Sequence, residues 1–373
     1  MDELNTWRRS GELSDLTIQI DDSEFNLHKF PMFIKSDYLK KKISECNDNK
    51  AVLKLSNFPG GKEIFEIVSE FCYGERSSLS QENVVQTRCA AHLLEMETTG
   101  NLASFCDRVI DDLLRNAKNS RSTSVSIEML AVCEQLGDIS DKAGIVDRCV
   151  SALIDVLSIS GRQQVTETLT GLSSNWFEKL LGAARKKNMR PHIIGEMLIS
   201  YLQISFIYEK DETEEETDKK KHVELADEER QHLLDDVLLK VFRDENKVGE
   251  KHALQERLNP ELAVKLLSEA ERLKCDVKDD LRRLCAKLVP RLKAPDLAQL
   301  PPEVVVEMVQ VGETDSANKE AACKTADIYL KALADNKRLD AETFAAVLNA
   351  APNDARTNHD NLFEVLHTLL QSG

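Results

Sequence analysis

Apolar and polar positions near the start of the chain follow the two-residue period of β-strands. Leucine and isoleucine alternate with polar residues over 16–20, which predicts a strand with one apolar face. A polar turn at 21–23 separates this segment from a second alternation over 24–28, and the pair predicts a β-hairpin. The same alternation over 51–55 predicts a third strand.

Through the rest of the chain, apolar positions recur at intervals of three and four residues, as in helices with one buried side. A helix is expected over 33–43, directly after Pro31, and another over 64–71, after the glycine pair at 60–61. The same spacing predicts further helices over 85–96, 102–113, 125–136, 143–157, 193–208, 225–242, 261–273, 277–288, 303–309, 317–334, 341–350 and 362–370, with one more beginning near Trp176.

Capping residues mark the starts of several of these helices. Ser80 and Asp340 stand where an N-cap side chain would accept a backbone hydrogen bond. Asn259 precedes Pro260 in the same way, and Pro191 also occupies a first-turn position, where proline is tolerated. These signals support the predicted helix starts independently of the apolar spacing.

The order of these elements divides the chain into a mixed part and a helical part. Residues 1–117 predict an α+β domain, a small sheet covered by helices. The polar, serine-rich stretch at 116–124 opens a helical linker region, 118–170, and an all-α helical domain follows over 171–373. Within it, the charged run near 209–222 cannot form a core, and we expect a disordered acidic loop there. No fixed-period repeat is visible.

Composition narrows the class of protein. The 373 residues carry 65 acidic and 49 basic side chains, giving a net charge of −16. This balance repels a phosphate backbone, so we expect no nucleic-acid partner. No apolar run has the length of a membrane span. The aromatic share of 5%, beside abundant leucine and alanine, favours helix packing over a β-sandwich.

The nine cysteines are an odd number without paired spacing, which indicates free thiols in a reducing compartment. Residues 1–5 lack the basic-then-apolar order of a signal peptide, and residues 371–373 do not form a prenylation signal. We therefore expect a cytoplasmic location, with peripheral attachment at the plasma membrane as an alternative.

Residue patterns that would carry catalysis are missing from the sequence. Cys89 and His92 share a helix face, but a metal site would need two further ligands, and a buried thiol is the better interpretation. The pair at 60–61, followed by Lys62, resembles the end of a phosphate loop without the rest of its pattern. No nucleophile elbow, zinc-peptidase helix or kinase motif occurs. We expect no enzyme activity, no cofactor and no metal.

Four motifs of the first domain point to a known family. The sequence has HKFP at 28–31, FPGG at 58–61, FCYG at 71–74 and RCAAHLLEM at 88–96. In this order they resemble a BTB/POZ domain, and more narrowly that of the non-phototropic hypocotyl family of plant phototropism adaptors. Further motifs of this family are matched at 146–153, 175–180, 190–196, 327–332 and 351–363. The resemblance does not extend to 210–311, which is divergent and charged, or to the C-terminal coiled coil of many members.

The resemblance implies a binding surface for a cullin-3-type scaffold. Ile43 and Glu45 form the hydrophobic-x-Glu tripeptide between a helix and the strand at 51–55. By this similarity Ile43 would anchor in a groove of the scaffold while Glu45 accepts hydrogen bonds at its rim, and Tyr38 and Tyr73 would join the contact. The alternative is a helix C-terminal turn with an ordinary exposed acid.

The resemblance also implies a homodimer. Asp15 and Lys29 match a polar pair of the BTB dimer interface, and Trp7 and Leu13 belong to the short segment that would exchange between subunits. The alternative for Asp15 and Lys29 is a hydrogen bond within one hairpin.

Taken together, the resemblance implies a substrate-recruiting adaptor of a cullin-3-type E3 ubiquitin ligase in signalling. The BTB domain would bind the cullin, and the helical domain would bind a client protein, for which the family suggests a photoreceptor-type kinase. The first alternative is a non-catalytic signalling scaffold that dimerises through the BTB domain without a cullin. An enzyme built on an unfamiliar helical domain is a weaker alternative.

Overall fold

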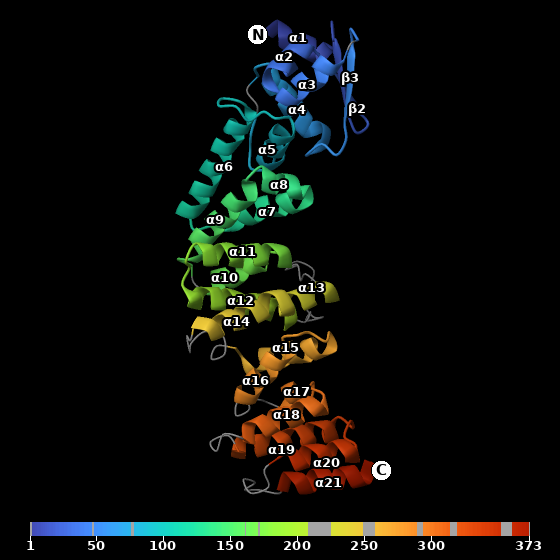
Figure 1. Cartoon of the computed structure of the whole chain (residues 1–373), viewed down its shortest axis with the longest axis vertical. Coiled ribbons are helices and arrows are strands. Elements are labelled where there is room, and N and C mark those ends of the chain that lie inside the picture. The colour runs from blue at the N-terminus through green and yellow to red at the C-terminus, as the bar shows by residue number, and fades with distance from the viewer. Residues whose placement is uncertain are drawn as a thin grey trace, which may run out of the picture. The chain divides into compact units, whose positions relative to one another are not determined.

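The structure of the protein is a computed structural model (Figure 1). The structure describes residues 2–46, 48–75, 78–160, 162–170, 172–207, 225–248, 258–288, 294–313, 319–351 and 360–372. The acidic loop expected near 209–222 and most of the motif at 351–363 lie outside the described residues.

A three-stranded sheet lies at the start of the chain, as the alternating pattern predicts. It consists of β1 (Leu16–Ile20), β2 (Ser23–Leu27) and β3 (Ala51–Leu55) in the order β2-β1-β3. β1 pairs antiparallel with β2 in the predicted hairpin and parallel with β3. As the central strand, β1 is buried almost throughout, and even Thr17 is only 6% exposed.

The helix expected over 33–43 is in fact two helices, α2 (Lys29–Lys35) and α3 (Asp37–Glu45). Ser36 separates them in an extended conformation. Its Oγ accepts a hydrogen bond from the Leu39 amide at 3.0 Å and donates one to the Leu94 carbonyl at 2.6 Å. The apolar spacing predicts one continuous helix here, but the buried Ser36 side chain caps a second helix and so divides it in two.

Three longer helices complete the first domain: α4 (Gly61–Cys72), α5 (Val84–Leu93) and α6 (Leu102–Asn119). Both glycines of the predicted pair have positive φ, and a Cβ on Gly60 would lie 2.1 Å from Cγ1 of Ile64. The predicted cap Ser80 does not act as one, because α5 begins at Val84 with Asn83 before it. An N-terminal helix, α1 (Asp2–Ser10), precedes the sheet.

The helices that follow pack on the first domain. They are α7 (Ser124–Leu136), α8 (Asp138–Lys142) and α9 (Ile145–Leu157), and α5 and α6 contact them directly. Residues 1–164 and 179–187 thus form one compact unit, and residues 165–178 and 188–373 form a second. Most of the region 118–170 belongs to the first unit.

The second unit contains helices in every described segment and no described strand. Asn259 caps α15 (Pro260–Arg272) and Asp340 caps α20 (Ala341–Ala350), as predicted. Pro191 is the first residue of α12 (Pro191–Phe206). The helix expected over 225–242 contains a π-helical turn, η1. The unit holds parts of α10 (Arg162–Leu169) and α11 (Ser174–Lys186), then α12 (Pro191–Phe206), α13 (Asp227–His232), η1 (Leu233–Leu238), α14 (Leu239–Val248), α15 (Pro260–Arg272), α16 (Lys278–Leu288), α17 (Ala294–Leu297), α18 (Pro302–Glu313), α19 (Lys319–Asp335), α20 (Ala341–Ala350) and α21 (Asp360–Ser372).

Among the helices that the structure describes, none combines the length and apolar composition needed to cross a membrane.

All nine cysteines are free thiols, and eight of them are buried. Cys46, at the end of α3, is the partly exposed one. Burial raises the pKa of the Cys89 and Cys149 thiols to about 12, so almost no thiolate forms there near neutral pH.

We expect iodoacetamide to modify Cys46 in the folded protein and the buried thiols only after urea is added. Peptide mass spectrometry measures this, and equal modification of Cys89 and Cys46 without urea would contradict it.

Candidate protein-interaction site

The residues predicted to contact a cullin lie on or beside α3, but they differ in exposure. Ile43 is 7% exposed, so its side chain already packs in the core of its own domain. Glu45 is exposed, and its carboxylate pairs with Nζ of Lys42 at 2.9 Å. Tyr38 is half-buried on the same helix. The surface that α3 offers to a partner therefore consists of Tyr38, Glu45 and nearby lysines, with Ile43 beneath it.

Tyr73 lies inside the domain, at the end of α4, and is 3% exposed. Its hydroxyl accepts a hydrogen bond from the His28 amide at 2.8 Å and lies 2.8 Å from Nδ1 of the same residue. The other ring nitrogen of His28 lies 2.9 Å from the Glu12 carbonyl. Burial raises the pKa of Tyr73 to about 12. These contacts join the end of the hairpin to α4, which is a structural role.

The four residues predicted at a dimer interface lie around the hairpin. An oxygen of Asp15 accepts a hydrogen bond from the Lys29 amide at 2.7 Å, and Nζ of Lys29 donates to the Asn49 carbonyl at 2.9 Å. The ring of Trp7 lies 6.4 Å from that of His28. The polar groups of Asp15 and Lys29 thus form hydrogen bonds within one chain. The side chain of Leu13 is 72% exposed and is the one best placed to contact a second copy.

The first unit exposes several large apolar side chains that the sequence did not single out as a surface. Phe30 is 72% exposed and Ile34 is 59% exposed, one turn apart on α2. Val52 on β3 is also 59% exposed. The helix was predicted to start at residue 33, so Phe30 lay outside it, and its position one turn before Ile34 was not recognised. A start at Lys29, directly after the strand, would have placed both residues on one helix face.

Arg8 anchors α1 to α4 through a cluster of acidic side chains. Its side chain is 4% exposed and contacts Glu66, Glu75 at 3.3 Å, and Oγ of Ser69 at 3.2 Å. Burial raises the pKa of the neighbouring Glu70 carboxyl. A cation buried among hydrogen-bonding partners holds the N-terminal helix on its own domain.

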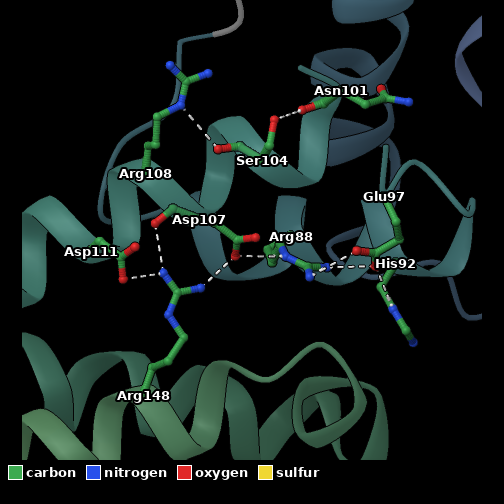
Figure 2. Close-up of polar contacts among 9 residues, drawn as sticks. All are labelled: Arg88, His92, Glu97, Asn101, Ser104, Asp107, Arg108, Asp111 and Arg148. Atoms are coloured by element: carbon green, nitrogen blue, oxygen red, sulfur yellow. Dashed lines mark hydrogen bonds and ion pairs between the residues drawn. The ribbon is translucent and has the colours of Figure 1, made fainter. Parts of the chain in front are cut away.

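A second ionic cluster joins the first domain to α9 (Figure 2). Arg88 of α5 has a side chain that is 8% exposed, and it contacts Glu97 at 3.1 Å and Asp107 at 3.0 Å. Arg148 of α9 reaches the same Asp107 at 2.5 Å and Asp111 at 2.6 Å. One carboxylate therefore bridges two guanidinium groups from different helices. No local pattern predicts this cluster, because Asp107 is 19 residues from Arg88 and 41 residues from Arg148.

Cys89 and His92 have different surroundings in the structure. Cys89 is buried, while Nδ1 of His92 lies 2.8 Å from Glu97. Among the described residues there is no group of three or more histidine, cysteine or acidic side chains that could hold a metal ion.

Comparison with known proteins agrees with this architecture. A model of the BTB/POZ domain matches residues 4–110, and a model of the NPH3 family matches residues 163–372, which is more than half of the chain. The chain is 25% identical to Root phototropism protein 2 of Arabidopsis thaliana over 96% of its own length and 65% of that protein.

Two further relatives from the same plant match slightly more than half of the chain at higher identity. BTB/POZ domain-containing protein SR1IP1 is 29% identical over 55% of this chain and 38% of its own length. BTB/POZ domain-containing protein SETH6 is 31% identical over 53% of this chain and 34% of its own length. The chain spans less than two thirds of the length of each of these relatives. The sheet with its covering helices, the helical remainder and the two matched models together show that this chain belongs to the NPH3 family and carries a BTB/POZ domain at its start.

Proposed function

We propose that the chain is a non-catalytic adaptor that brings a client protein to a cullin-3-type E3 ubiquitin ligase. The observation that carries this proposal is a BTB/POZ domain with exposed apolar and charged side chains on its outer helices, joined to an NPH3 region. A protein of this kind accelerates modification by holding other proteins close together, and it breaks no bond itself. The client would bind the helical region in the cytoplasm.

In this proposal the cullin binds the outer side of α3. Tyr38 supplies a half-buried aromatic ring, and Glu45 supplies a carboxylate at the rim. Such a combination, one aromatic side chain beside an exposed charge, is common in interface centres and rims. Ile43 would support this surface from below, and Tyr73 would hold the adjoining hairpin.

Substitutions on α3 test the cullin contact. We expect Tyr38→Ala combined with Glu45→Ala to weaken binding to the cullin N-terminal region about tenfold, since interface aromatics contribute about 1 kcal/mol or more. Glu63→Ala, a similarly exposed acid on α4, is the matched control and should bind like wild type. The measurement is calorimetric titration of the full chain. Unchanged binding by the double variant would reject this interface.

A dimer is proposed through the apolar face of α2, with Leu13 and Trp7 beside it. Covering these exposed apolar side chains with a partner would remove apolar surface from water, which is favourable. We expect Phe30→Glu combined with Ile34→Glu to raise the dimer dissociation constant at least about a hundredfold, because each copy loses two buried apolar side chains. Sedimentation velocity measures this. Phe363→Glu, at an exposed phenylalanine of α21, is the control, and a double variant that sediments like wild type would refute the proposal.

The second candidate is a signalling scaffold that dimerises without a cullin, as part of phototropism-like signalling with a photoreceptor-type kinase as client. The burial of Ile43 favours it, because this side chain is largely unavailable to a partner. Failure of the wild-type chain to bind the cullin N-terminal region, together with an intact dimer, would select this candidate.

A further inference from the structure

A pocket of about 520 Å³ opens on the first domain, and neither Arg88 nor Arg148 lines it. It lies between the end of α2, the end of α4 and the start of α6. The volume falls within the range of pockets that hold a small molecule or a peptide side chain.

Apolar side chains form the walls of this pocket. Phe71 and Phe105 meet edge to face, with ring centroids 5.7 Å apart. Leu79 and Leu102 add to this apolar lining. Phe105 is 40% exposed although it sits on a helix whose apolar face is otherwise largely buried. An aromatic ring left this open at the mouth of a pocket is suited to contact another apolar group.

Two cations flank these rings. Nζ of Lys35 lies 5.2 Å from the centre of the Phe71 ring, and the guanidinium carbon of Arg108 lies 4.4 Å from that of Phe105. Figure 2 shows Arg108 turned toward Ser104, whose carbonyl accepts a hydrogen bond from its Nε at 3.3 Å. Within the described residues, neither cation has a carboxylate at ion-pair distance.

The acidic residue at this pocket does not neutralise them. Glu75 lines the pocket, but its carboxylate pairs with Arg8 at 3.3 Å and with Arg9 at 2.9 Å. Among the described residues, Lys35 and Arg108 therefore remain available to an incoming carboxylate. Cations held over aromatic faces can each accept an ion pair from an incoming carboxylate without losing the ring contact.

We propose that this pocket binds a short protein segment in which an aromatic or large aliphatic side chain is flanked by acidic residues. The apolar side chain enters between Phe105 and Leu79, and the carboxylates meet Lys35 and Arg108. The pocket would thus be a second recognition surface of the first domain, separate from the outer side of α3. It does not depend on binding of a cullin.

The test uses the full chain and a fluorescent peptide, Glu-Asp-Phe-Asp-Glu, followed by anisotropy. We expect binding that weakens about tenfold or more when alanine replaces phenylalanine in the peptide, since the phenylalanine ring is the part of the peptide that leaves water. A peptide with lysine in place of every acidic residue should not bind. Lys35→Glu and Arg108→Glu should each weaken binding about fivefold, at low salt more than at high salt.

Arg115→Glu is the matched control, because Arg115 lies on the same helix as Arg108, is 67% exposed and pairs with Asp112 away from the pocket. It should bind the peptide like wild type. The inference is overturned if no peptide binds, if the alanine peptide binds equally well, or if Arg115→Glu weakens binding as much as Arg108→Glu.

Two further measurements distinguish binding of an acidic peptide in this pocket from binding of a cullin or of a lipid surface. Binding of the cullin N-terminal region should be unaffected by Lys35→Glu and Arg108→Glu, and its loss in both variants would assign the pocket to the cullin instead. Vesicles of phosphatidylserine and phosphatidylcholine should not be bound through Lys35 and Arg108. Binding to vesicles without binding to the peptide would overturn the inference in favour of a lipid surface.

Discussion

Ile43→Asp is expected to unfold the first domain rather than to remove a partner contact alone. Ile43 is 7% exposed at the end of α3, so the substitution leaves a cavity and places a carboxylate in apolar surroundings. Together these effects should lower the free energy of unfolding by about 4 kcal/mol, which is a large fraction of the stability of one domain. Hydrogen exchange of α3 and β3, followed by mass spectrometry, measures the loss.

Two milder variants distinguish the loss of core packing at Ile43 from the loss of a contact with a partner protein. Ile43→Val removes one methylene group and should lower the free energy of unfolding by about 1 kcal/mol. Glu45→Ala removes an exposed carboxylate that pairs with Lys42 and should change it by less than about 0.5 kcal/mol. An Ile43→Asp protein with wild-type hydrogen exchange that nevertheless fails to bind the cullin would contradict the packing role. It would make Ile43 a direct contact.

Asp107→Ala is expected to loosen the junction between the first domain and α9. One oxygen of Asp107 accepts hydrogen bonds from both Arg88 and Arg148, and without it the two guanidinium groups lose the negative charge between them (Figure 2). Arg88, with a side chain 8% exposed, keeps only Glu97. We expect the free energy of unfolding of this unit to fall by about 2–3 kcal/mol. Hydrogen exchange should rise most in α6 and α9.

The neighbouring Asp112→Ala provides the control for this second prediction. Asp112 lies on the same helix, is 66% exposed and pairs with Arg115 in an ordinary surface ion pair. Its removal should lower the free energy of unfolding by about 0.5 kcal/mol or less. If Asp112→Ala were as destabilising as Asp107→Ala, the bridge between the two arginines would have no special role. The double variant Asp107→Ala with Arg148→Ala should regain part of the loss, because it removes the repulsion between the two guanidinium groups.

Much of the fold could be predicted because its signals are local. The alternation over 16–20 and 24–28 is the period of a strand, and both segments form the hairpin. The caps Asn259 and Asp340 act within three residues of their own positions. The family motifs are also local, and they led to the BTB/POZ and NPH3 assignments that the comparisons confirm. The contacts assigned to a cullin and to a second copy stay predictions.

The break at Ser36 could not be predicted from its neighbours in sequence. Its hydroxyl donates to the carbonyl of Leu94, which is 58 residues away, and that contact fixes the new helix start. On α2, before the break, Ile34 is exposed like Phe30, while Ile43 on α3 lies in the core. Apolar spacing identifies a helix with a buried side, but the neighbours of that helix in the fold decide which residues are covered.

By itself, the sequence determined the kinds of element, their order, and a family resemblance carried by short motifs, since each of these depends on residues a few positions apart. Only the tertiary structure decided which apolar side chains remain exposed, and which charges meet. Arg88, Asp107 and Arg148 converge, and Lys35 and Arg108 flank one pocket, because helices distant in sequence pack side by side. Burial and ion pairing are properties of that packing, and no local pattern of residues encodes them.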